Sequence, residues 1–292
     1  MIKVWIEAMR LRTLPVSVAG VIAGCACAIH IGSIDVVPAL LCLIFAVLAQ
    51  IAANFGNEYY DFKNGIDRKG RAGFRRSVTE GEISPLAMRT ATYLTLAAAV
   101  AVGCSMLYYG PWWLLLVGIV IVLFALAYSA GPYPLSHHGL GDLAVVVFFG
   151  VVPVTLTCFL QTGSWEGMSE VLPTSVAVGL LAANVLIVNN YRDMDDDAAV
   201  GKRTTVVIFG RPAMSMAYLV SGVFAMGIMY PVWASLALWA LAVPALYLTL
   251  HVATWMKLKR AEGVALNPLL GRTAVNLLVF TVLFLAVCLL AG

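Results

Sequence analysis

The sequence predicts an all-α membrane protein in which nine transmembrane helices surround a central cavity, as a single domain over residues 1–292. Of the 292 residues, 62% are hydrophobic and only 11% are charged, which is more apolar surface than a water-soluble fold can hide. The apolar residues fall into runs of about 20, the length that a helix needs to cross a bilayer. These runs lack the alternating pattern of barrel strands, so helices are expected. The predicted spans are 14–33, 36–56, 86–109, 111–129, 141–161, 171–190, 212–230, 232–255 and 270–291.

The distribution of charge supports the count of nine. If the N-terminus is cytoplasmic, all 18 basic residues fall on the cytoplasmic side, as the positive-inside rule requires. The opposite loops contain only the acidic residues Asp35, Glu166 and Glu170. The basic residues precede the first span or follow the second, sixth and eighth: Lys3, Arg10, Arg12; Lys63, Arg68, Lys69, Arg71, Arg75, Arg76, Arg89; Arg192, Lys202, Arg203, Arg211; Lys257, Lys259, Arg260, Arg272.

The segment before the first span, from Trp5 to Pro15, is amphipathic and is expected to lie along the inner membrane surface. Two interpretations of its arginines, Arg10 and Arg12, remain open. Either they only anchor the topology, or one of them turns into the cavity to meet an anion.

Acidic and amide side chains end the second and the sixth predicted spans. Asn57 and Asp61 lie four residues apart and share a helix face, and Asn190, Asp193 and Asp197 share another. Carboxylates stacked in this way repel one another unless a divalent cation lies between them. Oxygen-rich sites of this kind suit Mg²⁺, which binds carboxylates, water and substrate phosphate. We therefore predict two Mg²⁺ half-sites that face each other, hold a diphosphate and lie at the cytoplasmic face.

Other acidic residues near these motifs have different expected positions. Asp67 follows Gly65, where we expect the helix to unwind so that the Asp67 carboxylate can join the first half-site. Glu58, Asp195 and Asp196 face away from the ligand stripe and are expected to be solvated.

Three loops on the same side have polar residues. The long basic loop from 67 to 85 can cap the site and bind phosphate, or contact lipid headgroups. The Pro- and Gly-rich turn after the fourth span contains Tyr128, Tyr133, His137 and His138, which can handle an aromatic hydroxyl or a proton, or simply be exposed. Lys202 and Arg203 closely follow the second acidic motif, where they can neutralise a diphosphate or anchor the topology.

Several other function classes are disfavoured. The basic residues follow the topology, so no nucleic-acid partner is expected. The six cysteines lie within apolar runs without metal-ligand spacing and are interpreted as inert thiols. A transporter remains an alternative, but its carboxylates should line a route through the bilayer midplane, whereas both acidic motifs lie at one face.

With these motifs the chain resembles, over nearly its whole length, the UbiA superfamily of intramembrane aromatic prenyltransferases. Asn57, Asp61 and Asp67 match the family's first acidic motif, although Glu58 stands where the family usually has Asp; Asp193 and Asp197 match the second. The resemblance is strongest to members that prenylate 1,4-dihydroxy-2-naphthoate in menaquinone biosynthesis, through Asp61-Phe-Lys63-x-Gly65-x-Asp67, Gly131-Pro-Tyr-Pro-Leu, Asn189-Asn190-x-Arg192-Asp193 and Arg12-Thr-Leu-Pro15.

The resemblance implies that polyprenyl diphosphate and 1,4-dihydroxy-2-naphthoate are the substrates, Mg²⁺ the cofactor and membrane lipid the surroundings, in the bacterial inner membrane. A sister activity on 4-hydroxybenzoate or a chlorin stays open. The implied metal ligands are Asn57, Asp61, Asp67, Asn190, Asp193 and Asp197, with Asp61, Asp193 and Lys63 as catalytic residues. The implied diphosphate partners are Lys63, Lys202 and Arg203, and the candidates for contact with the aromatic acceptor are Arg12, Tyr128, Tyr133 and His137.

Overall fold

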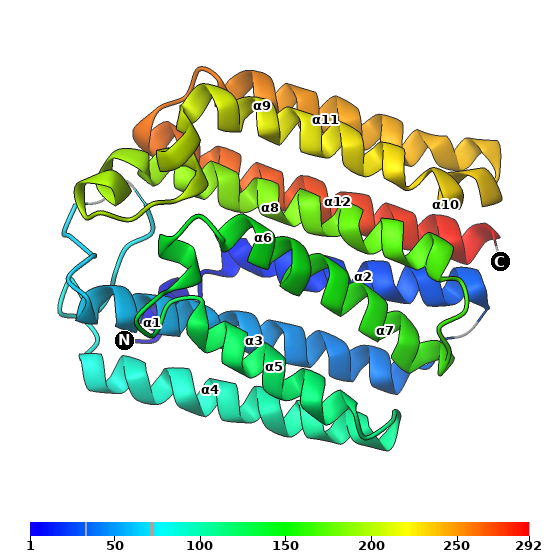
Figure 1. The fold of residues 1–292 in the computed structure, drawn as a ribbon, viewed down its shortest axis with the longest axis horizontal. Coiled ribbons are helices and arrows are strands. Elements are labelled where there is room, and N and C mark those ends of the chain that lie inside the picture. The colour runs from blue at the N-terminus through cyan, green and yellow to red at the C-terminus, as the bar shows by residue number, and fades with distance from the viewer. Residues whose placement is uncertain (33, 71–72, 292) are drawn as a thin grey trace.

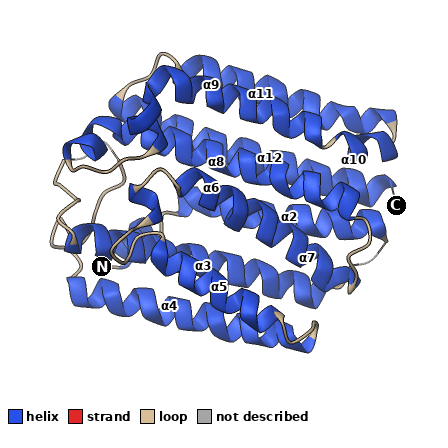
Figure 2. Ribbon diagram, in the orientation of Figure 1, coloured by secondary structure: helices blue, strands red, loops and turns tan. Residues whose placement is uncertain are grey.

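The computed structural model describes residues 1–32, 34–70 and 73–291, and every regular element within these ranges is a helix (Figure 2). The elements are α1 (Ile2–Ala8), η1 (Leu11–Thr13), α2 (Leu14–Ile31), α3 (Val36–Lys63), α4 (Pro85–Ser105), η2 (Met106–Tyr108), α5 (Leu114–Ala127), η3 (Leu135–His137), α6 (Gly141–Val145), the π-helical turn η4 (Val146–Val151), α7 (Val152–Thr162), α8 (Met168–Ala199), α9 (Thr205–Ile228), α10 (Tyr230–Ser235), η5 (Leu238–Leu241), α11 (Ala242–Leu258), η6 (Gly263–Leu266) and α12 (Asn267–Ala291).

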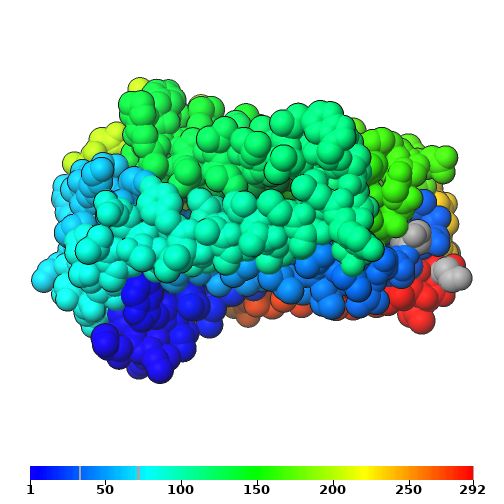
Figure 3. Space-filling model, turned by 90° about the horizontal axis from the view of Figure 1, so that it is seen from below, coloured from blue at the N-terminus to red at the C-terminus, as the bar shows by residue number. Residues whose placement is uncertain are grey.

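The long helices lie side by side and roughly parallel to one another (Figure 1). The C-terminal ends of α3 and α8 lie at the same end of the molecule, together with α1 and the loop between α3 and α4. Both acidic motifs are therefore at one end of the bundle, as the sequence predicts. Seen from below, α4 covers much of the face, and α1 projects near one end (Figure 3).

Within the described residues, eight helices are long and apolar enough to cross a membrane. The fourth predicted span corresponds to α5, which has only 14 helical residues and is shorter than a full crossing requires. The all-helical, multi-pass architecture is thus confirmed, while nine crossings and a cytoplasmic N-terminus stay predictions.

The seventh and eighth predicted spans begin and end at other residues than expected. The seventh was expected to start at 212, but α9 starts at Thr205, because the Thr204 hydroxyl accepts a hydrogen bond from the Val207 N–H and caps the helix. A break at Gly210, with φ of 82°, precedes Pro212. Pro231 does not interrupt the helical structure. It lies in the first turn of α10, where proline is tolerated.

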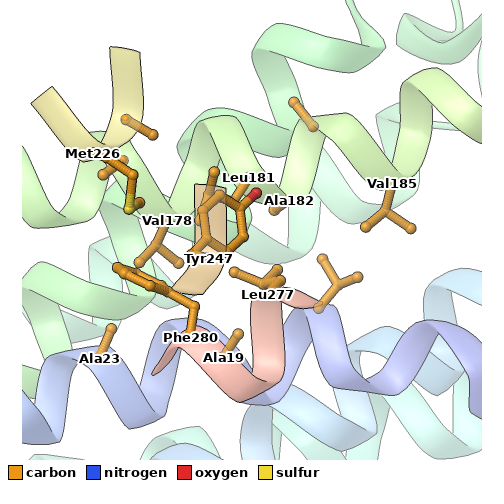
Figure 4. Close-up of a cluster of buried hydrophobic side chains, with 14 of the residues drawn as sticks. Ala19, Ala23, Val178, Leu181, Ala182, Val185, Met226, Tyr247, Leu277 and Phe280 are labelled. Atoms are coloured by element: carbon orange, nitrogen blue, oxygen red, sulfur yellow. The ribbon is translucent and has the colours of Figure 1, made fainter. Parts of the chain in front are cut away.

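The core is built around α2, α8 and α12. Figure 4 shows Ala19 and Ala23 of α2 lying beside Val178 and Leu181 of α8 and Phe280 of α12, and all five side chains are at most 1% exposed. Small residues allow the helix backbones to approach closely, as is common between membrane helices.

A close backbone contact joins η4 to α8. A Cβ atom on Gly179 would lie 3.0 Å from the Cα of Val146, and one on Gly150 would collide with the backbone of Gly179. This contact fixes the position of α8, and with it the second acidic motif, relative to the helices that enclose the cavity.

Candidate functional site

A cavity of about 610 Å³ lies among α2, α3, α5, the η4–α7 segment and α8. Its walls along the length of α5 and α7 are apolar and include Val117, Ile121 and Leu156. Its polar lining comes from the end where α3 and α8 finish, and includes Asn57, Asn190, Asp193, Lys202, Arg10, Arg76 and Arg192. The cavity therefore has a charged end and a long apolar body.

One arginine, Arg76, contacts all three members of the first acidic motif. Arg76 donates from Nη1 to Asn57 Oδ1 at 3.0 Å and from Nη2 to Asp61 Oδ2 at 3.2 Å, and its Nε lies 3.2 Å from Asp67 Oδ1. Asn57 Oδ1 also accepts from Arg10 Nη2 at 3.1 Å. The helix ends at Lys63 and Gly65 has a φ of 69°, so the chain unwinds before Asp67 as expected. This turn brings Asp67 to the same guanidinium as Asp61.

The second acidic motif lies on a buried face of α8. Asn190, Asp193 and Asp197 are 7%, 5% and 1% exposed, so all three side chains are buried. Arg192 pairs with both oxygens of Asp193 at 2.7 and 2.8 Å, which is a bidentate ion pair. Lys202 Nζ lies 3.8 Å from Asp197 Oδ1.

The loop between α3 and α4 connects the two motifs. The guanidinium carbons of Arg10 and Arg192 each lie 5.5 Å from the centroid of the Phe74 ring, which is within range of a cation–π interaction. Beside it, a Cβ on Gly73 would lie 2.7 Å from Arg192 Nη2 and 3.2 Å from Asp193 Oδ1. Phe74 thus contacts one arginine from each motif, and Gly73, Phe74 and Arg76 line the charged end of the cavity.

Glu58 corrects one expectation. We expected a solvated side chain, but Glu58 is fully buried and its Oε1 accepts a hydrogen bond from the Val78 N–H at 3.0 Å. Val78 itself packs among Phe55, Ile83 and Met88. The prediction failed because helix periodicity places a residue on a face but cannot say that a distant loop covers that face. Asp195, in contrast, is exposed as expected and pairs with Arg211 at 2.8 Å.

Residues of the turn after α5 divide into two groups. Tyr128 lines the cavity, and His137 Nε2 lies 3.6 Å from Asp61 Oδ1. Tyr133 is 60% exposed and stacks on His138 instead of entering the cavity. Of the aromatic-acceptor candidates in this turn, the structure therefore brings Tyr128 and His137 to the site and leaves Tyr133 outside it.

Three predicted basic residues are exposed and do not line the cavity: Lys63, Arg203 and Arg12. Lys63 is two residues from Asp61, and residues two apart point to nearly opposite sides of a helix. Arg203 contributes its backbone N–H, which donates to the carbonyl oxygen of His137 at 2.9 Å. Arg10, and not Arg12, is the N-terminal arginine that turns into the cavity.

Sequence reasoning assigned no individual role to Arg76, Arg192 or Phe74. Arg192 stands directly beside Asp193, which is the signal that could have identified it. Arg76 is one of five basic residues between 67 and 85, and nothing in an irregular loop distinguishes it from the others.

The donor chemistry of the two motifs fits Mg²⁺, which prefers carboxylate, amide and phosphate oxygens. Asp61 Oδ1 is buried and accepts no hydrogen bond, although His137 Nε2 lies 3.6 Å from it. Within residues 1–32, 34–70 and 73–291, however, no three acidic, histidine or cysteine side chains converge closely enough to enclose an ion. Arg76, Arg192 and Lys202 are paired with the carboxylates instead.

Comparison with known proteins agrees with this architecture. Residues 17–265 match the UbiA prenyltransferase family, and the chain belongs to this family. A 1,4-dihydroxy-2-naphthoate octaprenyltransferase of Escherichia coli (strain K12) is 34% identical over 96% of this chain and 93% of its own length. The protein of the same description from Mycobacterium tuberculosis (strain ATCC 25618 / H37Rv) is 35% identical over 73% of this chain and 72% of its own.

Solved structures share the fold. A UbiA homologue from Aeropyrum pernix K1 superposes with a TM-score of 0.70 at 17% identity and covers 97% of this chain and 98% of its own. A UbiA homologue from Archaeoglobus fulgidus bound to DMAPP and Mg²⁺ gives a TM-score of 0.65 at 16% identity, over 97% and 99% of the two chains.

Proposed function

We propose that this protein is a 1,4-dihydroxy-2-naphthoate polyprenyltransferase of menaquinone biosynthesis. It transfers the polyprenyl group of polyprenyl diphosphate to the naphthoate ring, with release of diphosphate and CO₂. The observation that carries the proposal is one cavity with two ends of opposite character. Its charged end presents Asn57, Asn190, Asp193 and basic side chains, and its body along α5 and α7 is apolar.

The shape of the cavity suits an amphipathic donor. The diphosphate lies at the charged end, and the isoprenoid tail extends along the apolar walls. Arg10, Arg76 and Lys202 supply positive charge where the C–O bond breaks and the diphosphate leaves with the electron pair. The apolar body keeps water away from the allylic cation until an electron-rich carbon of the naphthoate ring attacks it.

Asn57, Asp61 and Asp67 of the first motif, and Asn190, Asp193 and Asp197 of the second, are proposed to hold Mg²⁺. Bound there, Mg²⁺ would neutralise the diphosphate and stabilise it as a leaving group. Lys202 is retained as a diphosphate partner, since it lines the cavity beside Asp197. Lys63 and Arg203 would need to reorient to reach the diphosphate.

Tyr128 and His137 are proposed to contact the aromatic acceptor, because they reach the charged end from the turn after α5. Arg10 replaces Arg12 as the proposed partner of the acceptor carboxylate, since its guanidinium faces the cavity. The charged end is proposed to face the cytoplasm of a bacterium, where the water-soluble naphthoate can enter without crossing the membrane.

The test is prenyl transfer by the purified protein with polyprenyl diphosphate, Mg²⁺ and each of three acceptors: 1,4-dihydroxy-2-naphthoate, 4-hydroxybenzoate and a chlorin. Mass spectrometry should detect only the decarboxylated naphthoate product. Asp61→Asn and Asp193→Asn should each lower the rate roughly hundredfold or more, as loss of one stabilising group at a developing charge does. Exclusive turnover of another acceptor would reject the naphthoate assignment, and full activity of both variants would reject the site.

A further inference from the structure

We propose that the guanidinium of Arg76 takes the place of the metal ion at the first acidic motif when no ligand is bound. The guanidinium leaves this position when an ion–diphosphate complex binds. This inference rests on the proposed function, because it concerns the order in which ion and diphosphate reach the same site. Arg76 is then a positioning residue with two alternative sets of anionic partners.

The contacts of Arg76 are those of a bound cation. Its three guanidinium nitrogens each engage a different side chain of the motif: Asn57 at 3.0 Å, Asp61 at 3.2 Å and Asp67 at 3.2 Å. These are the three oxygen ligands that the sequence assigns to Mg²⁺ in the first half-site. The Arg76 side chain is only 11% exposed and that of Asp61 is fully buried. A planar fork of donors is well suited to satisfy such carboxylates in a buried place.

Arg76 and a divalent ion cannot hold the same oxygens at the same time. An ion that takes these oxygens without diphosphate must displace the guanidinium and leave it beside other positive groups, among them Arg10, which contacts the same Asn57 oxygen. An ion that arrives with diphosphate brings a new anionic partner for Arg76. Ion and diphosphate should therefore bind with positive coupling, each raising the affinity for the other.

The surroundings allow Arg76 to move without release of the whole loop. Two residues later, the Val78 N–H is fixed to Glu58, and Val78 lies in a buried cluster. The guanidinium can therefore turn from the carboxylates toward the cavity, which Arg76 already lines, while the loop stays attached at Val78.

The experiment measures Mn²⁺ binding by electron paramagnetic resonance on the purified full-length protein, with and without inorganic diphosphate. Arg76→Gln should bind Mn²⁺ alone about tenfold more tightly than the wild type, since hydrogen bonds to charged groups no longer compete. Diphosphate should strengthen Mn²⁺ binding in the wild type and have a smaller effect in the variant. Arg76→Lys, which keeps the charge but cannot reach three acceptors at once, should give an intermediate Mn²⁺ affinity.

Two matched variants test whether the position of Arg76, and not only its positive charge, controls Mn²⁺ affinity. Arg10→Gln removes the same charge from the same site but touches only Asn57 of the motif, so its effect should be clearly smaller than that of Arg76→Gln. Arg75→Gln should leave Mn²⁺ affinity unchanged, because Arg75 is 56% exposed and pairs with Glu82.

The inference is overturned if Arg76→Gln binds Mn²⁺ no more tightly than Arg10→Gln does. It is also overturned if Arg76→Gln and the wild type have the same Mn²⁺ affinity. If the wild type still binds Mn²⁺ with diphosphate in those cases, the proposed function stands and only the role of Arg76 fails. If neither wild type nor variants bind Mn²⁺ with diphosphate, the ion-dependent site fails, and the role of Arg76 fails with it.

Discussion

Glu58 offers a sharp test of how the loop between α3 and α4 is attached. Its carboxylate accepts the Val78 N–H at 3.0 Å, and both residues are buried. Glu58→Ala removes the acceptor and leaves a buried N–H without a partner, which costs about 1–3 kcal/mol. For a chain of this size, that loss lowers the melting temperature by roughly 2–12 °C, since about 2–4 °C corresponds to each kcal/mol.

The same substitution should weaken donor binding, because the released loop carries Arg76. The expected order of thermal stability is wild type, then Glu58→Gln, which keeps a side-chain oxygen at the same reach, and last Glu58→Ala. Melting is followed by intrinsic fluorescence in detergent, and the KM for polyprenyl diphosphate is measured on the same preparations. A Glu58→Ala protein that melts with the wild type and has an unchanged KM would show that the loop is held by other contacts.

Three further predictions concern other parts of the molecule. Gly179→Ala should destabilise the protein by about 1–3 kcal/mol in thermal melts, because the new Cβ meets the backbone of Val146. The control Gly227→Ala, whose Cβ meets nothing within 4 Å, should be neutral or slightly stabilising. Equal melting temperatures of the two variants would refute the close contact at Gly179. Gly118→Phe should fill the apolar body of the cavity, so that activity with a long polyprenyl donor falls more than activity with a C10 donor; an equal loss with both would mean that the tail does not run past α5. Chelation of divalent ions should abolish transfer, and added Mg²⁺ should restore it; turnover that persists in excess chelator would reject the ion-dependent mechanism.

Much of the fold could be predicted because a membrane helix is specified by a local property, its run of apolar residues. The exceptions are places where local chemistry overrides that run. The cap at Thr204 starts α9 early, and α10, with Pro231 in its first turn, runs across the predicted boundary at residue 230. The short α5 satisfies the hydrophobic pattern but not the length of a crossing.

The candidate site was predictable as far as helix periodicity reaches. Spacing predicted that Asn190, Asp193 and Asp197 share a helix face, and all three are buried. The same periodicity, applied to Lys63, places that residue opposite Asp61, so the exposed position of Lys63 could have been foreseen. The partners of the acidic groups could not, because Arg76 and Phe74 lie in a loop whose path depends on the burial of Glu58 and Val78.

The position of α5 bears on how the protein selects its donor. None of the 14 residues of α5 is fully buried, yet α5 forms a long apolar wall of the cavity. A hydrocarbon tail lying against that wall meets the same kind of surface that it would meet among lipid chains, so moving between the two releases little free energy. Apolar contact alone therefore cannot retain a donor or distinguish it from the surrounding lipids. Discrimination depends on the few polar atoms that bind its diphosphate group.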